Sequence, residues 1–218
     1  MTRGIFITLE GPEGAGKTTQ RGIMAEFFKE RGLAVTLTRE PGGTPAAEEL
    51  REFILRPRDE QISGTAEVLL FFAARALHVE NVIKPALARG DVVLCDRFVD
   101  STYAYQAAGR GIKPETIRPI EEYAIGQFAP DKTFLFDLDP SIGLARAAAR
   151  GKLDRFETEH HEFFERVRLA YLAQVNRKPW QYAVIDASKS VEEVSSDVRP
   201  YLEGIYEAYR LNKTLKQD

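Results

Sequence analysis

The sequence predicts an α/β fold in which a five-stranded parallel sheet is flanked by helices on both faces. Three observations support this fold: five short apolar segments, helical patterns between them, and a glycine-rich loop directly after the first apolar segment. Strands that alternate with helices form βαβ units, and their crossovers cover both faces of a parallel sheet. No linker rich in Pro, Gly or Ser divides the chain, so we interpret residues 1–218 as one domain.

The five expected strands are apolar along their length, as is typical of strands that are buried on both faces. They are Gly4–Glu10, Ala34–Thr38, Asp91–Asp96, Thr133–Leu138 and Tyr182–Asp186. The expected helices are Thr19–Arg31, Thr44–Leu55, Thr65–Arg89, Pro140–Arg150, Glu159–Asn176 and Val191–Arg210. Ligands of such sheets bind beyond the carboxyl ends of the strands, so functional residues are expected there.

Composition and charge exclude several classes of protein. A hydrophobic share of 44% and a charged share of 29% are typical of a globular chain and exclude a disordered one. The net charge of −3 provides no overall positive field for a nucleic acid. Cys95 is the single cysteine, so we expect no disulfide within the chain and a reducing, cytoplasmic compartment. No apolar run has the length of a membrane span, and the first residues do not resemble a signal peptide.

A phosphate-binding loop is the most specific motif. Residues Gly11–Thr18 match G-x-x-x-x-G-K-[ST] between the first expected strand and the first expected helix. Glycines let backbone N–H groups turn inward around an anion, and the helix N-terminus adds a partial positive charge. Lys17 is expected to reach the terminal phosphates, and the Thr18 hydroxyl is expected to bind Mg²⁺. The predicted ATP-binding residues are Gly11, Pro12, Glu13, Gly14, Ala15, Gly16, Lys17, Thr18 and Thr19.

A second acidic ligand for the metal is expected at the end of another strand. Asp96 ends the apolar segment that begins at Val92, which is the pattern of a Walker B element. Asp137 and Asp139 end the fourth expected strand and are alternatives. For Asp139 we favour a role as the N-cap of the helix that follows.

The class of phosphate-loop protein depends on what accepts the phosphoryl group. The guanine-reading and switch motifs of GTP-binding proteins, N-K-x-D and D-x-x-G, do not occur, which favours a small kinase. Arg39 and Arg97 end two expected strands, and guanidinium groups suit an acceptor phosphate. Phe71 and Arg75 are four residues apart and share one helix face. A ring for stacking and a donor for a base carbonyl would then point into one pocket. From the residues alone, however, a core aromatic is the favoured interpretation of Phe71.

Two further segments add polar candidates. Ser101, Thr102, Tyr105 and Gln106 follow the strand that ends at Asp96 and suit a sugar or a base edge; an ordinary helix start with Ser101 or Thr102 as N-cap is the alternative. Arg146, Arg150 and Arg155 fall within about residues 141–157, which we interpret as a mobile lid inserted in the domain. Lid arginines would neutralise charge on the transferring phosphoryl group and exclude water. A solvated helix face with acidic partners is the alternative for this segment.

In combination these motifs resemble the thymidylate kinase family, in its bacterial type with arginines in the lid. The resemblance covers about residues 4–206. The motifs are E-G-x-E-G-A-G-K-T-T from Glu10, T-R-E-P-G-G-T from Thr38, E-V-L-L-F-F-A-A-R from Glu67, V-I-K-P-A-L from Val82, D-R-F from Asp96, S-T-x-A-Y-Q from Ser101, G-R-G-I from Gly109 and A-R-G-K-L-D-R-F-E from Ala149. The resemblance implies the nucleoside-monophosphate-kinase form of the phosphate-loop fold and a homodimer.

The family resemblance also implies roles for individual residues. Phe71 would stack on thymine, and Arg75 would bind the base and approach the acceptor phosphate, which Arg39 and Arg97 would hold. Thr102 and Gln106 match positions near the base edge, and Tyr105 matches one beside the sugar 2′ carbon. Glu13 matches an acidic position near the acceptor and the metal. The expected catalytic residues are Lys17, Glu13, Arg97, Arg146, Arg150 and Arg155, and the expected metal ligands are Thr18 and Asp96.

The expected activity is Mg²⁺-dependent transfer of the γ-phosphoryl group of ATP to dTMP, which gives dTDP and ADP. A deoxynucleoside kinase is one alternative, and it would not need Arg39 and Arg97 for an acceptor phosphate. A phosphate-loop protein that binds ATP without turnover is the other. Acceptor-stimulated release of ADP separates these three possibilities.

Overall fold

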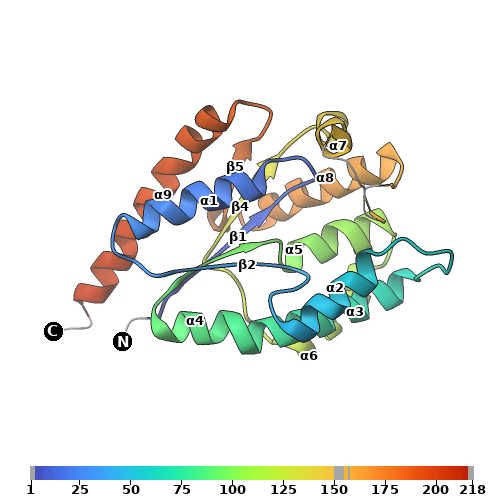
Figure 1. Cartoon of the computed structure of the whole chain (residues 1–218), viewed down its shortest axis with the longest axis horizontal. Helices are drawn as coiled ribbons and strands as arrows, with labels where there is room; N and C mark the ends of the chain where they lie inside the picture. The colour runs from blue at the N-terminus through green and yellow to red at the C-terminus, as the bar shows by residue number, and fades with distance from the viewer. Residues whose placement is uncertain (1–2, 150–154, 157, 216–218) are drawn as a thin grey trace.

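The chain folds around one parallel sheet, as the sequence predicts (Figure 1). The computed structural model describes residues 3–149, 155–156 and 158–215. Five strands lie in the order β2-β3-β1-β4-β5, and every pairing is parallel. Their bounds are β1 (Ile5–Glu10), β2 (Val35–Arg39), β3 (Val92–Asp96), β4 (Lys132–Asp137) and β5 (Tyr182–Asp186).

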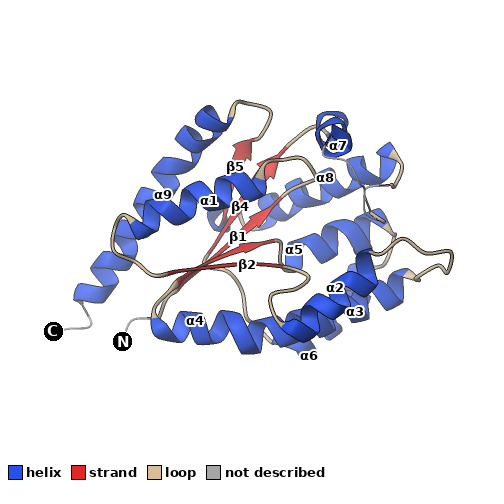
Figure 2. Cartoon of the chain, in the orientation of Figure 1, coloured by secondary structure: helices blue, strands red, loops and turns tan. Residues whose placement is uncertain are grey.

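Helices cover both faces of the sheet, which confirms the predicted three-layer architecture (Figure 2). The helices are α1 (Lys17–Lys29), α2 (Pro45–Leu55), α3 (Gly64–His78), α4 (Lys84–Arg89), α5 (Val99–Thr102), α6 (Pro114–Ile125), α7 (Pro140–Ala149), α8 (His161–Arg177) and α9 (Val191–Thr214). On one face, α1 and α9 pack against alternate side chains of the strands, such as Ile7 and Leu94. On the other face, α4 and the end of α6 pack against Phe6 and Val93. Among the described residues, no helix is both long enough and apolar enough to cross a membrane.

The strand register brings the carboxyl ends of three strands together. Leu9 of β1 is the partner of Asp96 on β3, and Asp96 is also the partner of Arg39 on β2. The phosphate loop that follows β1 therefore begins beside the acidic end of β3 and the basic end of β2. This is the edge of a parallel sheet where ligands bind.

The expected helix Thr65–Arg89 is interrupted. The α-helical turns of α3 end at His78, a wider π-helical turn covers Val79–Ile83, and α4 follows. Pro85 is the physical reason, because its ring would clash with the carbonyl group four residues earlier in a regular α-helix. The wider turn removes that clash while the chain continues in one direction.

Three other details differ from the sequence prediction. Helix α6 was not predicted, because Pro119 in its interior breaks the usual helical pattern. The proposed N-cap role of Ser101 or Thr102 is wrong, since α5 begins at Val99 with no side-chain cap. Strand β2 is partly exposed rather than buried on both faces, with Leu37 46% exposed, because it lies at the edge of the sheet. The expected N-cap role of Asp139 agrees with the structure. The Asp139 carboxylate accepts a hydrogen bond at 2.9 Å from the backbone N–H of Ser141, in the first turn of α7.

Candidate active site

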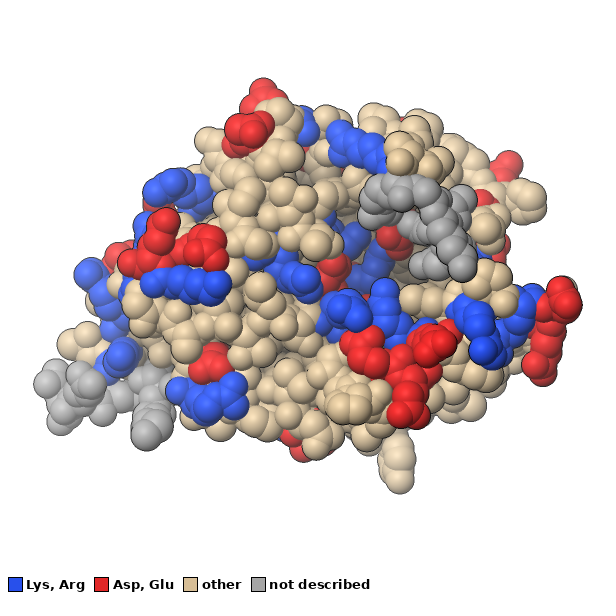
Figure 3. Space-filling view, in the orientation of Figure 1, with Lys and Arg blue, Asp and Glu red and all other residues tan. Residues whose placement is uncertain are grey.

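A cavity of about 610 Å³ opens at the carboxyl ends of β1, β2 and β3, and we call it the central cavity. It is lined by Glu13, Gly14, Ala15, Gly16, Lys17, Thr18, Thr19, Arg39, Glu40, Pro41, Arg51, Leu55, Phe71, Arg75, Asp96, Arg97, Phe98, Ser101, Thr102, Tyr105, Gln106, Arg146, Ala147 and Phe156. Basic and acidic side chains both face into the hollow in the space-filling view (Figure 3). The cavity thus joins the phosphate loop to most of the residues predicted to bind an acceptor.

The phosphate loop takes the backbone form that its glycines allow. Gly14 and Gly16 both have positive φ, 71° and 76°, and α1 begins directly after Gly16. The Lys17 ammonium is buried and donates to the carbonyl oxygens of Gly11 at 3.0 Å and Pro12 at 2.8 Å. Burial and the positive charge of Arg97 lower the pKa of Lys17. The ammonium group therefore lies at the loop, where it can exchange carbonyl partners for phosphate oxygens.

Thr18 and Asp96, the two expected metal ligands, lie next to each other in the structure. The Thr18 hydroxyl lies 3.4 Å from Oδ2 of Asp96, and both residues line the central cavity. Oδ1 of Asp96 is buried and has no hydrogen-bond partner among the described residues. Buried carboxylate oxygens normally have a partner, so this orphaned acceptor suits a cation or a water bound to one. The donor set of one hydroxyl and one carboxylate fits Mg²⁺, which keeps several water ligands.

Part of the central cavity is lined by the residues predicted to bind an acceptor, and we call this part the acceptor side. Arg97 is the centre of the polar network there. It pairs with Glu13 of the phosphate loop, and it donates to the hydroxyl groups of Ser101, Tyr105 and Tyr171 at 3.1–3.2 Å. Its backbone has a φ of 68°, the only left-handed conformation of a described residue other than glycine. Burial opposes the charge, but Glu13 and the two tyrosines hold the pKa of Arg97 above its ordinary value. A permanent positive charge is thereby fixed between the phosphate loop and the acceptor side.

A buried carboxylate behind the cavity supports this network. Glu10, at the end of β1, accepts hydrogen bonds from the Phe98 N–H at 2.7 Å, from Ser101 at 2.6 Å and from Tyr171 at 3.1 Å. Two of these partners also contact Arg97. Burial, together with the nearby carboxylate of Asp100, raises the pKa of Glu10 to about 7. Glu10 therefore holds the backbone and the hydroxyls that surround Arg97.

Phe71 and Arg75 line the same cavity, as their spacing on one helix predicts. Arg75 is 2% exposed, and it donates to Glu40 at 2.6 Å, to the Thr102 hydroxyl at 3.1 Å and to the Phe98 carbonyl at 3.0 Å. A guanidinium has five N–H groups, so these three bonds leave donors for a ligand. The Phe71 ring lies 6.1 Å from that of Phe156 and is only partly buried, so it remains accessible for stacking.

Gln106 is held by a second buried carboxylate. Its side-chain amide donates to Oε2 of Glu67 at 3.0 Å. Glu67 is fully buried and also pairs with Arg155 at 2.7 Å and Arg110 at 3.4 Å. Arg155 does not line the central cavity, and one of its terminal nitrogens is buried without a partner among the described residues. Its position beside Glu67 places it at the rear of the acceptor side.

Two further predicted arginines, Arg39 and Arg146, also line the central cavity. Arg39 is about half exposed and pairs with Glu48 at 2.8 Å at the start of α2. Arg146, from α7, donates to the carbonyl oxygens of Ala187 at 3.0 Å and Gly14 at 3.4 Å, so it spans the phosphate loop and the loop after β5. Arg150 lies outside the described residues.

Several residues of the site were not found from the sequence. Glu40, Tyr171 and Glu67 contact the predicted Arg75, Arg97 and Gln106 respectively. Glu10 accepts a hydrogen bond from the predicted Ser101. Arg51 lines the cavity and donates to the Pro41 carbonyl at 2.9 Å. A carboxylate at the end of an apolar strand was a usable signal for Glu10. Tyr171 gave none, because it lies 74 residues from Arg97 within an ordinary amphipathic helix.

Comparisons with known proteins agree on one family. A family model described as thymidylate kinase matches residues 9–198. Two curated relatives named thymidylate kinase, from Pseudomonas putida (strain GB-1) and Ectopseudomonas mendocina (strain ymp), are 56% and 55% identical over 207 residues. These residues are 95% of this chain and 99% of each relative. The solved structure of thymidylate kinase from Ehrlichia chaffeensis has a TM-score of 0.75 at 32% identity, covering 92% of this chain and 99% of that chain.

Proposed function

The chain belongs to the thymidylate kinase family, and we propose that its central cavity transfers the γ-phosphoryl group of ATP to dTMP. Phosphorylation of dTMP is a step of dTTP synthesis, and the family implies a nucleotide phosphoryl donor and a metal. Our proposal adds the identities ATP and Mg²⁺ and the residues that bind them. The observation that carries it is that one cavity joins the phosphate loop to Phe71, Arg75 and Arg97.

On the donor side, backbone N–H groups of residues 13–19 bind the ATP phosphates and Lys17 neutralises their charge. Thr18 and Asp96 would hold Mg²⁺, because the Asp96 carboxylate has a buried oxygen without a partner among the described residues. When bound, Mg²⁺ withdraws charge from the phosphate oxygens. Arg146 already contacts the loop at Gly14, which suits a role in holding the donor.

On the acceptor side, Phe71 stacks on the thymine ring while Arg75, Thr102 and Gln106 bind the base edge. Arg39, Arg97 and Ser101 hold the dTMP phosphate, with Glu13 fixing Arg97 by its ion pair. Tyr105 occupies the space beside the sugar. The acceptor phosphate is already a nucleophile at neutral pH, so the reaction needs alignment and charge neutralisation rather than a strong general base.

We also propose the arrangement around the site. Residues 1–218 form one kinase domain, and about residues 141–157 form its lid, with Arg146 and Arg150 bringing positive charge to the transferring group. Arg155 instead pairs with Glu67 and does not line the central cavity. A homodimer is supported by apolar side chains exposed on α3 and α6, which pack together: Leu69 is 53% exposed and Tyr123 is 96% exposed. A cytoplasmic location suits a reaction that consumes ATP.

A coupled assay of ADP formation tests the reaction. Mg·ATP is offered with dTMP, dUMP, CMP, AMP or thymidine at equal concentration. We expect the strongest stimulation with dTMP. Stimulation by thymidine but not by dTMP would indicate a nucleoside kinase. Bound ATP with no stimulation by any acceptor would indicate a protein without turnover.

The substitution Lys17→Met tests the assignment of the phosphate loop. We expect kcat to fall by roughly 100-fold or more. The substitution removes the positive charge of Lys17 that stabilises the transferring phosphoryl group, and it keeps the length of the side chain. Lys29→Met, at the exposed end of the same helix, is the matched control and should retain full activity. Stopped-flow measurement of turnover, with circular dichroism to check folding, gives the result. Activity within a few fold of wild type in the Lys17 variant would show that the assignment is wrong.

A further inference from the structure

A buried histidine lies behind the acceptor side of the central cavity, in a position that the proposed mechanism does not use. His78, at the end of α3, is fully buried. Its Nδ1 lies 3.0 Å from Oε1 of Glu40, and its Nε2 lies 2.6 Å from the hydroxyl oxygen of Thr38. Glu40 and Thr38 are 4% and 7% exposed. Three polar side chains are therefore joined without access to solvent.

The chemistry of the partners determines the direction of these hydrogen bonds. Glu40 also binds Arg75, so its carboxylate is an acceptor only, and Nδ1 of His78 must donate to it. In a neutral imidazole Nε2 is then an acceptor, and the Thr38 hydroxyl donates to it. The chain of contacts runs from Thr38 through His78 and Glu40 to Nε of Arg75, which lies 2.6 Å from Oε2 of Glu40.

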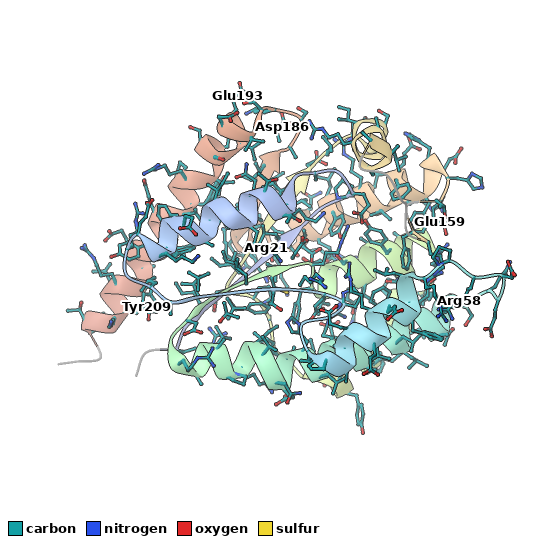
Figure 4. The ribbon with its side chains drawn as sticks, in the orientation of Figure 1. Arg21, Arg58, Glu159, Asp186, Glu193 and Tyr209 are labelled. Carbon is teal, nitrogen blue, oxygen red and sulfur yellow. The ribbon has the colours of Figure 1, made fainter. Side chains whose placement is uncertain are left out.

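The same histidine also supports the loop that follows β2. A Cβ atom on Gly43 would lie 2.7 Å from Nε2 of His78 and 2.8 Å from the Thr38 hydroxyl oxygen, so the loop backbone fits closely against the ring. Gly43 donates its N–H to Glu48, which pairs with Arg39. The Thr38 backbone is also held by α1, because Arg21, labelled in Figure 4, donates to the Thr38 carbonyl oxygen at 2.6 Å.

We propose that His78 is a positioning residue for the acceptor, acting through the hydrogen bond that it donates to Glu40. This inference rests on the proposed function, because Arg75 and Arg39 are the groups that meet dTMP there. With His78 in place, one oxygen of Glu40 faces the imidazole and the other faces Arg75. Arg75 is thereby fixed with its remaining N–H groups toward the cavity. Without the donor, the Glu40 carboxylate can rotate, and Arg75 loses its fixed direction.

Substitutions at His78 separate the two hydrogen bonds. His78→Asn keeps a donor near the position of Nδ1, whereas His78→Gln places its amide near Nε2 and loses the bond to Glu40. His78→Leu loses both bonds. We expect the Kd and KM of dTMP to rise roughly 10-fold in the Leu and Gln variants, with most of the loss restored in the Asn variant. The constants for ATP should change less than about twofold in all three, since the donor side is not contacted.

The measurements are calorimetric binding of dTMP and of ATP alongside steady-state turnover. His161→Leu, an exposed histidine on α8, is the matched control and should leave all constants unchanged. A parallel loss of dTMP and ATP binding, or an Asn variant no better than the Gln variant, would overturn the proposal. If the Leu variant does not fold, the Asn and Gln pair makes the same comparison. Wild-type dTMP binding without turnover would refute the proposed function, while the binding constants would still test His78.

Discussion

At the scale of single residues, carboxylates that touch no ligand determine which groups face the central cavity. Glu67 pairs with two arginines, so its carboxylate oxygens accept hydrogen bonds on every side. Gln106 must therefore turn its amide N–H groups toward Glu67, which leaves its carbonyl oxygen for the cavity. An oxygen there matches the ring N–H of thymine and mismatches cytosine, which has an acceptor at that position.

The substitution Glu67→Gln is predicted to weaken this selectivity. A glutamine can present either its oxygen or its amide group, so Gln106 is no longer held in one orientation. We expect the ratio of kcat/KM for dTMP over dCMP to fall at least roughly fivefold, the equivalent of about one hydrogen bond. The control is Glu80→Gln, an exposed residue paired with Lys84 outside the site. An unchanged ratio in an active variant would show that Glu67 does not orient Gln106.

Sequence reasoning located the side chains of the site better than the contacts that hold them. The phosphate loop, Asp96 and the pair Phe71 and Arg75 were found because short spacings determine their geometry. Partners such as Tyr171 and Glu67 come from distant segments, and only the fold brings them into contact. Arg155 shows the same limit: it was predicted as a lid arginine, and it pairs with Glu67, 88 residues away.

At the scale of elements, α7 lies against the phosphate loop through two glycines. A Cβ atom on Gly14 would collide with the carbonyl oxygen of Gly143, and one on Gly143 would collide with the carbonyl oxygen of Glu13. The close approach brings Arg146 of α7 within reach of the loop. The position of this helix is thus linked directly to the shape of the donor site.

Gly143→Ala is predicted to displace the phosphate loop or α7. We expect kcat/KM for ATP to fall by roughly 10-fold or more, because small displacements of reacting groups are costly. The matched control is Gly204→Ala in α9, where no atom lies within 4 Å of the added carbon. That control should keep full activity and raise the free energy of unfolding by about 0.5–1 kcal/mol. Equal kinetics in the two variants would contradict the prediction.

The secondary structure shows where sequence patterns fail. The five strands were found to within a residue or so at each end, because a central parallel sheet needs continuous apolar segments. Two of the errors in helices involve proline: Pro85 introduces a π-helical turn after α3, and Pro119 lies inside α6. Proline disfavours a helix locally, but packing of α3, α4 and α6 against the sheet and one another outweighs that cost.

At the scale of the whole molecule, the buried Glu10 makes stability depend on pH. Its pKa is about 7 in the folded chain against an ordinary value of 4.5. Between these values the folded state binds more protons than the unfolded state, so the contribution of Glu10 to the free energy of unfolding decreases as the pH rises. The contribution of Glu193 to the free energy of unfolding depends on pH in the opposite direction, because its hydrogen bonds to Ser190 lower its pKa. That contribution is lost as the pH falls below 4.5.

The variant Glu10→Gln tests this dependence. Its amide can accept from the Phe98 N–H and donate to a hydroxyl, so the hydrogen bonds of the site are kept. We expect its free energy of unfolding, relative to wild type, to rise by up to about 3 kcal/mol between pH 4.5 and pH 8. Urea unfolding of both proteins at several pH values gives this difference in free energy. The other titrating groups are present in both proteins, so their contributions cancel in the difference. A difference that does not change with pH would show that Glu10 titrates normally.

The hydroxyl of Tyr171 has a consequence for how the protein is made. It joins Glu10, near the beginning of the chain, to Arg97 and Ser101 in the middle. A ribosome that has released residues 1–140 has delivered the phosphate loop and four of the five strands, yet Arg97 still lacks one of its partners. The hydrogen-bond network around Arg97 can therefore be completed only after α8 has left the ribosome, late in synthesis of the chain.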